Sequence, residues 1–243
     1  SGIICIAFAF FYLRYATPEY NAEAKIMLMN NDGLSNPAEA VLNDLVQRTN
    51  ADNKMIEDEI EVLKSRKLMK GVVRKLDLNK QFFVKGRFHD TQFFPITKAP
   101  IKVNFIASDS MIYESNFSFS VLITSETKFS FVHNSKDTGE EVSEKMFFGK
   151  NVPSQIGDII VTPNTEKLSN LIGQTIYVEI SPLDKVAEKY KNAIRISSIA
   201  EGSKVLNLSL DDTSSNRAIA VINNLIDEYK LASDVILVNL FPV

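Results

Sequence analysis

The chain has 243 residues and a formal net charge of −3, from 27 basic and 30 acidic residues. This near-balance disfavours a dedicated nucleic-acid-binding protein, which usually carries a basic face. The length is sufficient for one large domain or two small ones with an ample core. Cys5 is the only cysteine, so the sequence offers no pair for an internal disulfide and no cysteine metal site. Domains of the bacterial periplasm can also lack disulfides, so export stays open.

The first predicted element is an apolar run, Ile3–Leu13, which ends at Arg14. It has no polar stripe, which disfavours an amphipathic surface helix. A membrane span needs about 20 apolar residues, so we expect the run to be the end of a transmembrane helix whose other part precedes this chain. The tyrosines on either side of Arg14 are typical of an interfacial anchor. No small-x-small cleavage site follows, which disfavours a secretory signal; a buried helix of a soluble protein is the remaining alternative.

The next segment alternates between apolar and polar residues over Tyr20–Leu28, which predicts a strand with one buried face. Asn30–Gly33 has the composition of a turn. A short helix is predicted after it, with Asn36 as the cap and Pro37 at the first helical position. Asn53–Leu76 is the clearest helix, because its apolar residues recur at helical spacing on one face.

Charge is unevenly distributed along this predicted helix. Acidic residues occupy its first half and basic residues its second: Glu57, Asp58, Glu59 and Glu61, then Lys64, Arg66, Lys67, Lys70, Arg74 and Lys75. This order complements the helix dipole, which is worth up to about 1 kcal/mol for a charge near a terminus. The basic run is compatible with a nucleic-acid or lipid patch. An ordinary solvated face is favoured, because the acidic residues balance it.

The middle of the chain has a different sequence pattern: short runs, rich in phenylalanine, in which apolar and polar residues alternate. Repeated strands separated by Asn, Asp and Gly predict an antiparallel β subdomain over Pro95–Thr162. The strands are indicated by Ile101, Val103 and Phe105; Phe117, Phe119, Val121 and Ile123; Phe129 and Phe131; Met146–Phe148; and Ile159–Val161.

The last third returns to mixed structure. Strands are predicted at Thr175–Ser181, Ile194–Ile199 and Val205–Leu210, with a helix from Pro182 to Asn192 between the first two. A strongly amphipathic helix follows over Ser215–Lys230, capped by Ser214 or Ser215. The segment Leu231–Val243 is read either as a short strand or as an end cut from its partner. We expect Tyr20–Leu28, Thr175–Ser181 and Val205–Leu210 to pair in one sheet covered by the two long helices.

Residues that commonly carry catalysis are sparse. His89 and His133 lie far apart without metal-ligand spacing. Neither phosphate-binding glycine motif occurs, nor a G-x-S-x-G elbow. Asp211 and Asp212 form a carboxylate pair, but their position before a helix cap favours a turn. Two glycosylation sequons, at Asn116 and Asn207, match a pattern that is frequent by chance. We predict no catalytic, cofactor-binding or metal-binding residues and no cofactor.

The order of these elements resembles the Wzz-type chain-length determinant family of polysaccharide co-polymerases. The stretch Pro18–Ile26 after the apolar run is similar to the family's entry strand. Val178–Asp184, the strands up to Ser209 and the helix Ala218–Tyr229 resemble the larger members, which are fused to a cytoplasmic tyrosine autokinase. The family's long extended helices, second membrane span and kinase are missing from this sequence, so we expect it to be a fragment.

This resemblance implies an inner-membrane protein whose periplasmic domain oligomerises into a ring and sets the length of a surface or capsular polysaccharide, without a periplasmic active site. The implied partners are other copies of the chain, a polysaccharide polymerase, an outer-membrane export channel and the lipid bilayer, with the polysaccharide itself as a further candidate and no nucleic acid. Two other classes stay open. One is the outer part of a tyrosine autokinase whose kinase lies downstream, and the other is a receptor sensor domain with one concave pocket.

The expected fold class is α+β, with a mixed sheet covered by helices and an inserted antiparallel β subdomain. The expected organisation has five parts. Residues 1–14 are the end of a transmembrane helix, residues 15–94 the first half of a Wzz-like domain and residues 95–165 a β-rich subdomain. Residues 166–230 are the second half of the Wzz-like domain, and residues 231–243 are a truncated end.

Overall fold

The computed structural model describes residues 18–29, 51–86, 89–134, 141–165, 168–200, 203–232 and 236–241. It divides into two compact units: a β-rich unit of residues 77–186, and an α/β unit that combines residues 19–76 with residues 187–243. Three predicted features lie outside the described residues, namely the apolar run Ile3–Leu13, the turn Asn30–Gly33 and the helix after Asn36.

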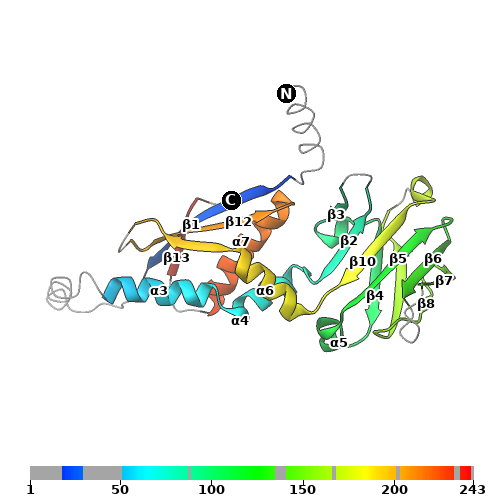
Figure 1. Ribbon diagram of the computed structural model, residues 1–243, viewed down its shortest axis with the longest axis horizontal. Helices are drawn as coiled ribbons and strands as arrows, with labels where there is room; N and C mark the ends of the chain where they lie inside the picture. Colours follow the sequence, from blue (N-terminus) through cyan, green and yellow to red (C-terminus); the bar gives the residue numbers. More distant parts are fainter. Residues whose placement is uncertain are drawn as a thin grey trace, which may run out of the picture. The chain divides into compact units, whose positions relative to one another are not determined.

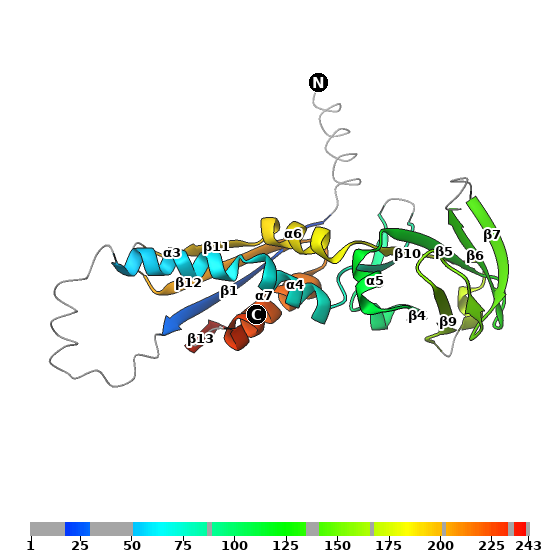
Figure 2. The same ribbon diagram turned by 90° about the horizontal axis from the view of Figure 1, so that it is seen from below.

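The α/β unit contains a four-stranded sheet in the order β11-β12-β1-β13 (Figure 1; β11 is labelled in Figure 2). The strands are β11 (Arg195–Ser198), β12 (Val205–Asp212), β1 (Tyr20–Met29) and β13 (Ile236–Phe241). In β1 the side chains alternate as the sequence predicts: Ala22, Ala24, Ile26 and Leu28 are buried, whereas Asn21, Glu23 and Lys25 are exposed. The strand interpretation of the last segment is confirmed, because β13 pairs with β1.

Helices bury the apolar side of this sheet. α7 (Ser215–Ala232) contacts both β1 and β12, and it also contacts α4 (Arg66–Lys75). The buried side chains of α7 recur at helical spacing on one face: Ala218, Val221, Ile222, Leu225, Ile226 and Tyr229. α3 (Ala51–Leu63) contacts β11, and α6 (Leu183–Ala193) leads into that strand.

The predicted helix Asn53–Leu76 is wrong as a single element, because the chain leaves helical geometry at Ser65. Ser65 has extended backbone angles, and its side chain accepts a hydrogen bond from the backbone N–H of Leu68. A serine in this conformation satisfies one of the unpaired N–H groups at the start of a new helix. α4 then ends at Lys75, and Asp77 adopts a left-handed conformation, which aspartate tolerates better than most residues.

The β-rich unit consists of two antiparallel sheets. The larger has the strand order β3-β2-β10-β5-β6-β7, and the smaller has the order β4-β9-β8 (Figures 1 and 2). The larger contains β3 (Thr91–Phe93), β2 (Lys80–Val84), β10 (Thr175–Ile180), β5 (Phe117–Ile123), β6 (Lys128–Asn134) and β7 (Glu141–Phe147). The smaller contains β4 (Ile101–Ile106), β9 (Asp158–Pro163) and β8 (Asn151–Val152). The short helices are η1 (Ile96–Lys98), α5 (Asp109–Glu114) and η2 (Leu168–Leu171).

One side of the larger sheet belongs to a core built from aromatic and β-branched residues. Fully buried members include Phe129, Phe131, Val121 and Ile176. Their rings pack at tilted angles, for example Phe119 against Phe131 with centroids 5.1 Å apart, a geometry that aromatic pairs prefer. The predicted phenylalanine-rich β subdomain is therefore present in the structure.

The predicted placement of Thr175–Ser181 is wrong. The sequence predicts this strand in one sheet with Tyr20–Leu28 and Val205–Leu210, but β10 lies in the β-rich unit between β2 and β5. Alternation shows only that one face of the strand is buried, and the phenylalanine-rich core buries that face in place of the helices of the α/β unit. The β-rich unit is accordingly wider than the expected range 95–165.

The α+β class is confirmed by three sheets together with several helices. The sheet of the α/β unit is not mixed, however, because the strand pairs in it are antiparallel.

Candidate functional site

The histidines and the carboxylate pair do not form a catalytic cluster. Among the described residues there is no group of three or more His, Cys, Asp or Glu side chains that could hold a metal ion. His133 lies in β6 with its ring centroid 5.0 Å from that of Phe131, and His89 lies before β3. Asp211 and Asp212 belong to the end of β12, where they pair with residues of β1. The predicted turn is confirmed at Asp212, because its side chain accepts a hydrogen bond from the backbone N–H of Ser214 (2.9 Å) just before α7.

Both aspartates are used in structural ion pairs. Asp211 accepts hydrogen bonds from Asn21 (2.7 Å) and Arg195 (2.6 Å), and these two interactions lower the pKa of its carboxyl group. Asp212 pairs with Arg217, whose Nε lies 2.9 Å from Oδ2. Both carboxylates thus accept charge-assisted hydrogen bonds, which are stronger than hydrogen bonds between neutral groups.

Burial affects the pKa values of Arg217 and of its neighbour Tyr190. Burial raises the pKa of Tyr190 to about 12, and the hydrogen bond to Asp212 adds to the rise. Burial is the largest single effect on the pKa of Arg217 and would lower it, but the hydrogen bond with Asp212 and the Coulombic interactions with Tyr190 and Asp212 together outweigh burial, so the pKa is raised. This cluster fixes the start of α7 against α6 and β12.

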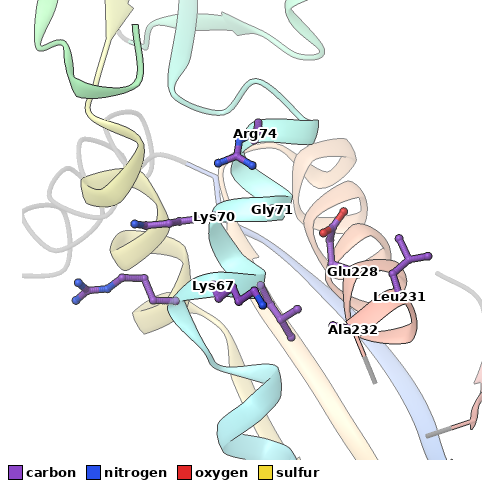
Figure 3. Close-up of a pocket in the computed structure, with 9 residues that line it drawn as sticks. Lys67, Lys70, Gly71, Arg74, Glu228, Leu231 and Ala232 are labelled. Atoms are coloured by element: carbon purple, nitrogen blue, oxygen red, sulfur yellow. The ribbon is translucent and has the colours of Figure 1, made fainter. Parts of the chain in front are cut away.

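The candidate functional site is an open hollow between α4 and α7, with a volume of about 700 Å³ (Figure 3). We call it the basic hollow, because four of its residues are cationic. It is lined by Arg66, Lys67, Leu68, Lys70, Gly71, Arg74, Glu228, Leu231 and Ala232. The helical spacing of the basic run in the sequence places these cations together on α4.

The centre of the basic hollow is the approach of α4 to α7. Figure 3 shows Glu228 extending from α7 towards Gly71, while Lys70 and Arg74 extend from the side of α4 that faces away from α7. A Cβ atom at Gly71 would lie 2.5 Å from Oε2 of Glu228. Glycine therefore leaves the space that this carboxylate occupies. Leu231, at the rim, is 81% exposed, which is unusual for a large apolar side chain on a core helix.

An ion pair with α6 adjoins the basic hollow. Arg66 contacts Glu188 through Nε (3.1 Å) and through a terminal nitrogen (2.9 Å), and Lys191 lies 3.6 Å from the same carboxylate. The hydrogen bond from Arg66 lowers the pKa of Glu188. These side chains are solvent-exposed, so the pair positions Arg66 more than it stabilises the fold.

The neighbouring helix α3 carries the opposite charge. Glu57, Asp58 and Glu61 are exposed, and Val62 beside them is 43% exposed. Glu59, on the inner side, accepts a hydrogen bond from the hydroxyl of the buried Tyr229. The α/β unit thus presents an acidic face on α3, defined by Glu57, Asp58 and Glu61, and a basic face on α4.

A second hollow, of about 530 Å³, lies on the outer face of the larger sheet of the β-rich unit. Its lining includes Phe83, Tyr177, Ser118 and Ser120. Sequence reasoning did not identify it, because no motif marks it and because it assembles from strands far apart in the chain. The only available signal was the polar half of each alternating run.

Comparison with known protein families gives a match at the beginning of the chain. Residues 1–76 match the family model of the chain length determinant protein, Wzz. No curated protein matches the chain. In the structure, the described part of the matched segment provides β1, α3 and α4, including the basic face of α4.

The match bears on the membrane expectation as well. In the described ranges, no helix is both long enough and apolar enough to span a bilayer. The matched segment does, however, include the apolar run Ile3–Leu13, which lies outside those ranges.

The matched segment cannot form its sheet alone, because β1 lies between β12 and β13, which come from the other end of the chain. This arrangement places β1 from the matched segment beside β12, which belongs to the second stretch in which the sequence resembles the family. The predicted resemblance to the Wzz-type polysaccharide co-polymerases is therefore confirmed over residues 1–76, and it supports a role for this protein in determining chain length in polysaccharide biosynthesis.

Proposed function

We propose that this chain is the periplasmic part of an inner-membrane polysaccharide co-polymerase. It acts as an oligomeric scaffold that controls the length of a surface or capsular polysaccharide and assists its export, without catalysing a reaction itself. The family match supports the chain-length role. The apolar run Ile3–Leu13 supports the membrane anchor, since it contains no charged residue and is followed by Arg14 between two tyrosines, as is typical of a membrane interface.

The observation that carries the scaffold proposal is the separation of charge within the α/β unit. The acidic face of α3 and the basic hollow are both exposed, and each has an exposed apolar residue beside it, Val62 and Leu231. Opposite charges around an apolar contact are the ordinary composition of a protein interface with a polar rim. We therefore propose that the acidic face of one copy docks on the basic hollow of the next.

A contact between two different faces of identical subunits is heterologous, and it closes into a ring when the rotation per subunit permits. Individual exposed charge pairs are weak, at about 0–1 kcal/mol each. Anchors in one membrane would compensate, because tethering raises the effective concentration of the copies. The proposed further partners are the polysaccharide polymerase, the outer-membrane export channel and the bilayer, and a tyrosine kinase domain would lie outside this chain.

Charge reversal tests the contact in the full-length protein with its membrane spans. We expect Lys67→Glu with Lys70→Glu to reduce the particle mass in detergent and to alter the polysaccharide length in cells. Glu57→Lys with Glu61→Lys should do the same. Combining all four substitutions should restore both, because the charges are then opposite again.

Lys98→Glu with Lys102→Glu is the matched control, since both lysines are exposed and belong to the β-rich unit, not to α3 or α4. Melting curves of each variant establish that it is folded. A monomeric wild-type protein, or an unchanged polymer length after gene deletion, would reject the scaffold and favour a sensor domain. If the fourfold variant recovers neither the particle mass nor the polysaccharide length, only the assignment of these two faces to the contact is rejected.

A further inference from the structure

The outer face of the larger sheet carries an ordered row of side chains. The strand registers align Gln92 with Phe83, Phe83 with Tyr177, Tyr177 with Ser120, Ser120 with Val132, and Val132 with Ser143. Residues paired across antiparallel strands project from the same face of a sheet. Because Ile176 and Val178 point into the core, this row lies on the opposite, outer face, across the strands labelled in Figures 1 and 2.

The centre of this row is hollowed because β5 contributes only serines there. Ser118 and Ser120 form the floor of the second hollow, which we call the serine trough. On one side stand Phe83 and Tyr177, stacked with ring centroids 5.5 Å apart and ring planes 16° apart. On the other side stands Val132. Small residues between larger ones on three adjacent strands leave a trough along β5.

Polar side chains converge on the serine trough from several strands. Glu179 lines it from β10, Asn134 from β6 and Glu141 from β7, and Asn116 lies at the start of β5. With the serine hydroxyls they supply both donors and acceptors of hydrogen bonds. Lys85 also lines the trough, but its ammonium group lies 4.1 Å from the centre of the Tyr177 ring, so the aromatic ring already interacts with this positive charge.

We infer that the serine trough binds a strand of neutral polysaccharide. A sugar ring presents an apolar C–H face and a rim of hydroxyl groups, and the trough offers an aromatic wall together with hydroxyl, amide and carboxylate groups. A few placed polar groups within a concave, partly aromatic surface are typical of ligand sites. The carboxylates of Glu141 and Glu179 would repel an acidic polymer, because like charges at close range interact unfavourably.

This inference rests on the proposed function only for the source of the glycan. It assigns to the β-rich unit a direct contact with the growing or exported polymer, whereas the α/β unit carries the contacts between copies. The two roles depend on different residues, so they can be tested separately.

The experiment measures binding of the detergent-solubilised full-length protein to three probes: the surface polysaccharide purified from cells that carry the gene, a neutral glucan, and polygalacturonate. We expect the cell polysaccharide to bind at least tenfold more tightly than polygalacturonate. Tyr177→Ala should weaken binding at least fivefold, by removing part of the aromatic wall. Ser118→Trp should weaken it similarly, by filling the exposed floor.

Lys145→Ala is the control, because this residue is exposed on β7 but does not line the trough, and it should bind as the wild type does. Unchanged melting temperatures for the variants exclude unfolding as the cause. The inference is overturned if the wild type does not bind the cell polysaccharide, if polygalacturonate binds equally well, or if both trough variants retain full binding. Those outcomes leave the charge-reversal test of the scaffold unaffected, and an unchanged polymer length after gene deletion leaves the binding test unaffected.

Discussion

Single residues matter most where the α/β unit buries charge. Arg217 and Asp212 have side chains only 10% and 7% exposed, and Tyr190 packs beside them. Removing one partner of such a pair leaves an uncompensated buried charge, which is strongly destabilising. The phenol of Tyr190 belongs to the same cluster, because its hydrogen bond to Asp212 requires the protonated form.

The raised pKa of Tyr190 predicts a loss of stability at alkaline pH. An unfolded tyrosine titrates near 10, whereas burial raises the pKa of Tyr190 to about 12. The folded state therefore holds the proton more strongly, so this contribution is complete below pH 10 and disappears as the pH rises through 12. The expected decline is up to about 1.4 kcal/mol per pH unit in this window.

Urea denaturation at pH 9 to 12 measures this decline, and Tyr190→Phe is the control because it has no ionisable hydroxyl. The variant loses the hydrogen bond to Asp212, at about 1 kcal/mol, but its alkaline slope should be shallower than that of the wild type. Other tyrosines titrate equally in both proteins. Parallel slopes would show that Tyr190 does not bind its proton more tightly in the folded state.

At the scale of the element, α7 organises the α/β unit. Its buried face packs against β1, β12 and α4, while its exposed end carries Leu231 at the basic hollow. The same helix therefore has a core face and a surface end, which its amphipathic pattern alone does not distinguish.

The substitution Leu225→Asp is expected to unfold the α/β unit. Leu225 is fully buried, and an unpaired carboxylate there costs several kcal/mol, which is comparable with the whole stability of an ordinary domain. Asn216→Asp is the control, because Asn216 is exposed in the first turn of α7, where a negative charge favours the helix dipole. Thermal melting followed by circular dichroism distinguishes them. A native-like transition for Leu225→Asp would mean that this face is an exposed interface.

At the scale of the whole molecule, the chain leaves the α/β unit after Leu76, forms the β-rich unit and returns near Ala187. The sheet of the α/β unit is consequently complete only when both ends of the chain are present, since β1 pairs with β12 on one side and with β13 on the other. All strands of the β-rich unit, by contrast, lie within residues 77–186, and this unit has its own core.

This topology predicts a selective effect of truncation after Ile194. Removing β11, β12, α7 and β13 deprives β1 of both neighbours and uncovers the apolar residues of α4, so the α/β unit should unfold. The β-rich unit retains all of its strands and should remain folded. Amide hydrogen exchange should show protection kept in β5, β6 and β10 but lost in β1 and α4. Continued protection of β1 would contradict the dependence on the C-terminal segment.

The sequence by itself determined the α+β class, β1, the core face of α7, the phenylalanine-rich strands and the resemblance to the Wzz family. These are encoded locally, because period-two and helical patterns report which face of an element is buried. Ser65, which caps the start of α4, was also a local signal in the sequence. The apolar face that continues through Asn53–Leu76 hid this helix boundary.

Only the tertiary structure decided which strands pair and which side chains converge. Alternation in Thr175–Ile180 is satisfied equally well by either core, and long-range pairing placed the strand between β2 and β5. The partnership of Arg217 with Asp212 and the meeting of Gly71 with Glu228 likewise depend on how the elements pack. The serine trough is the clearest case: its floor comes from one strand and its walls from others, and no local pattern specifies neighbours that lie far apart in the chain.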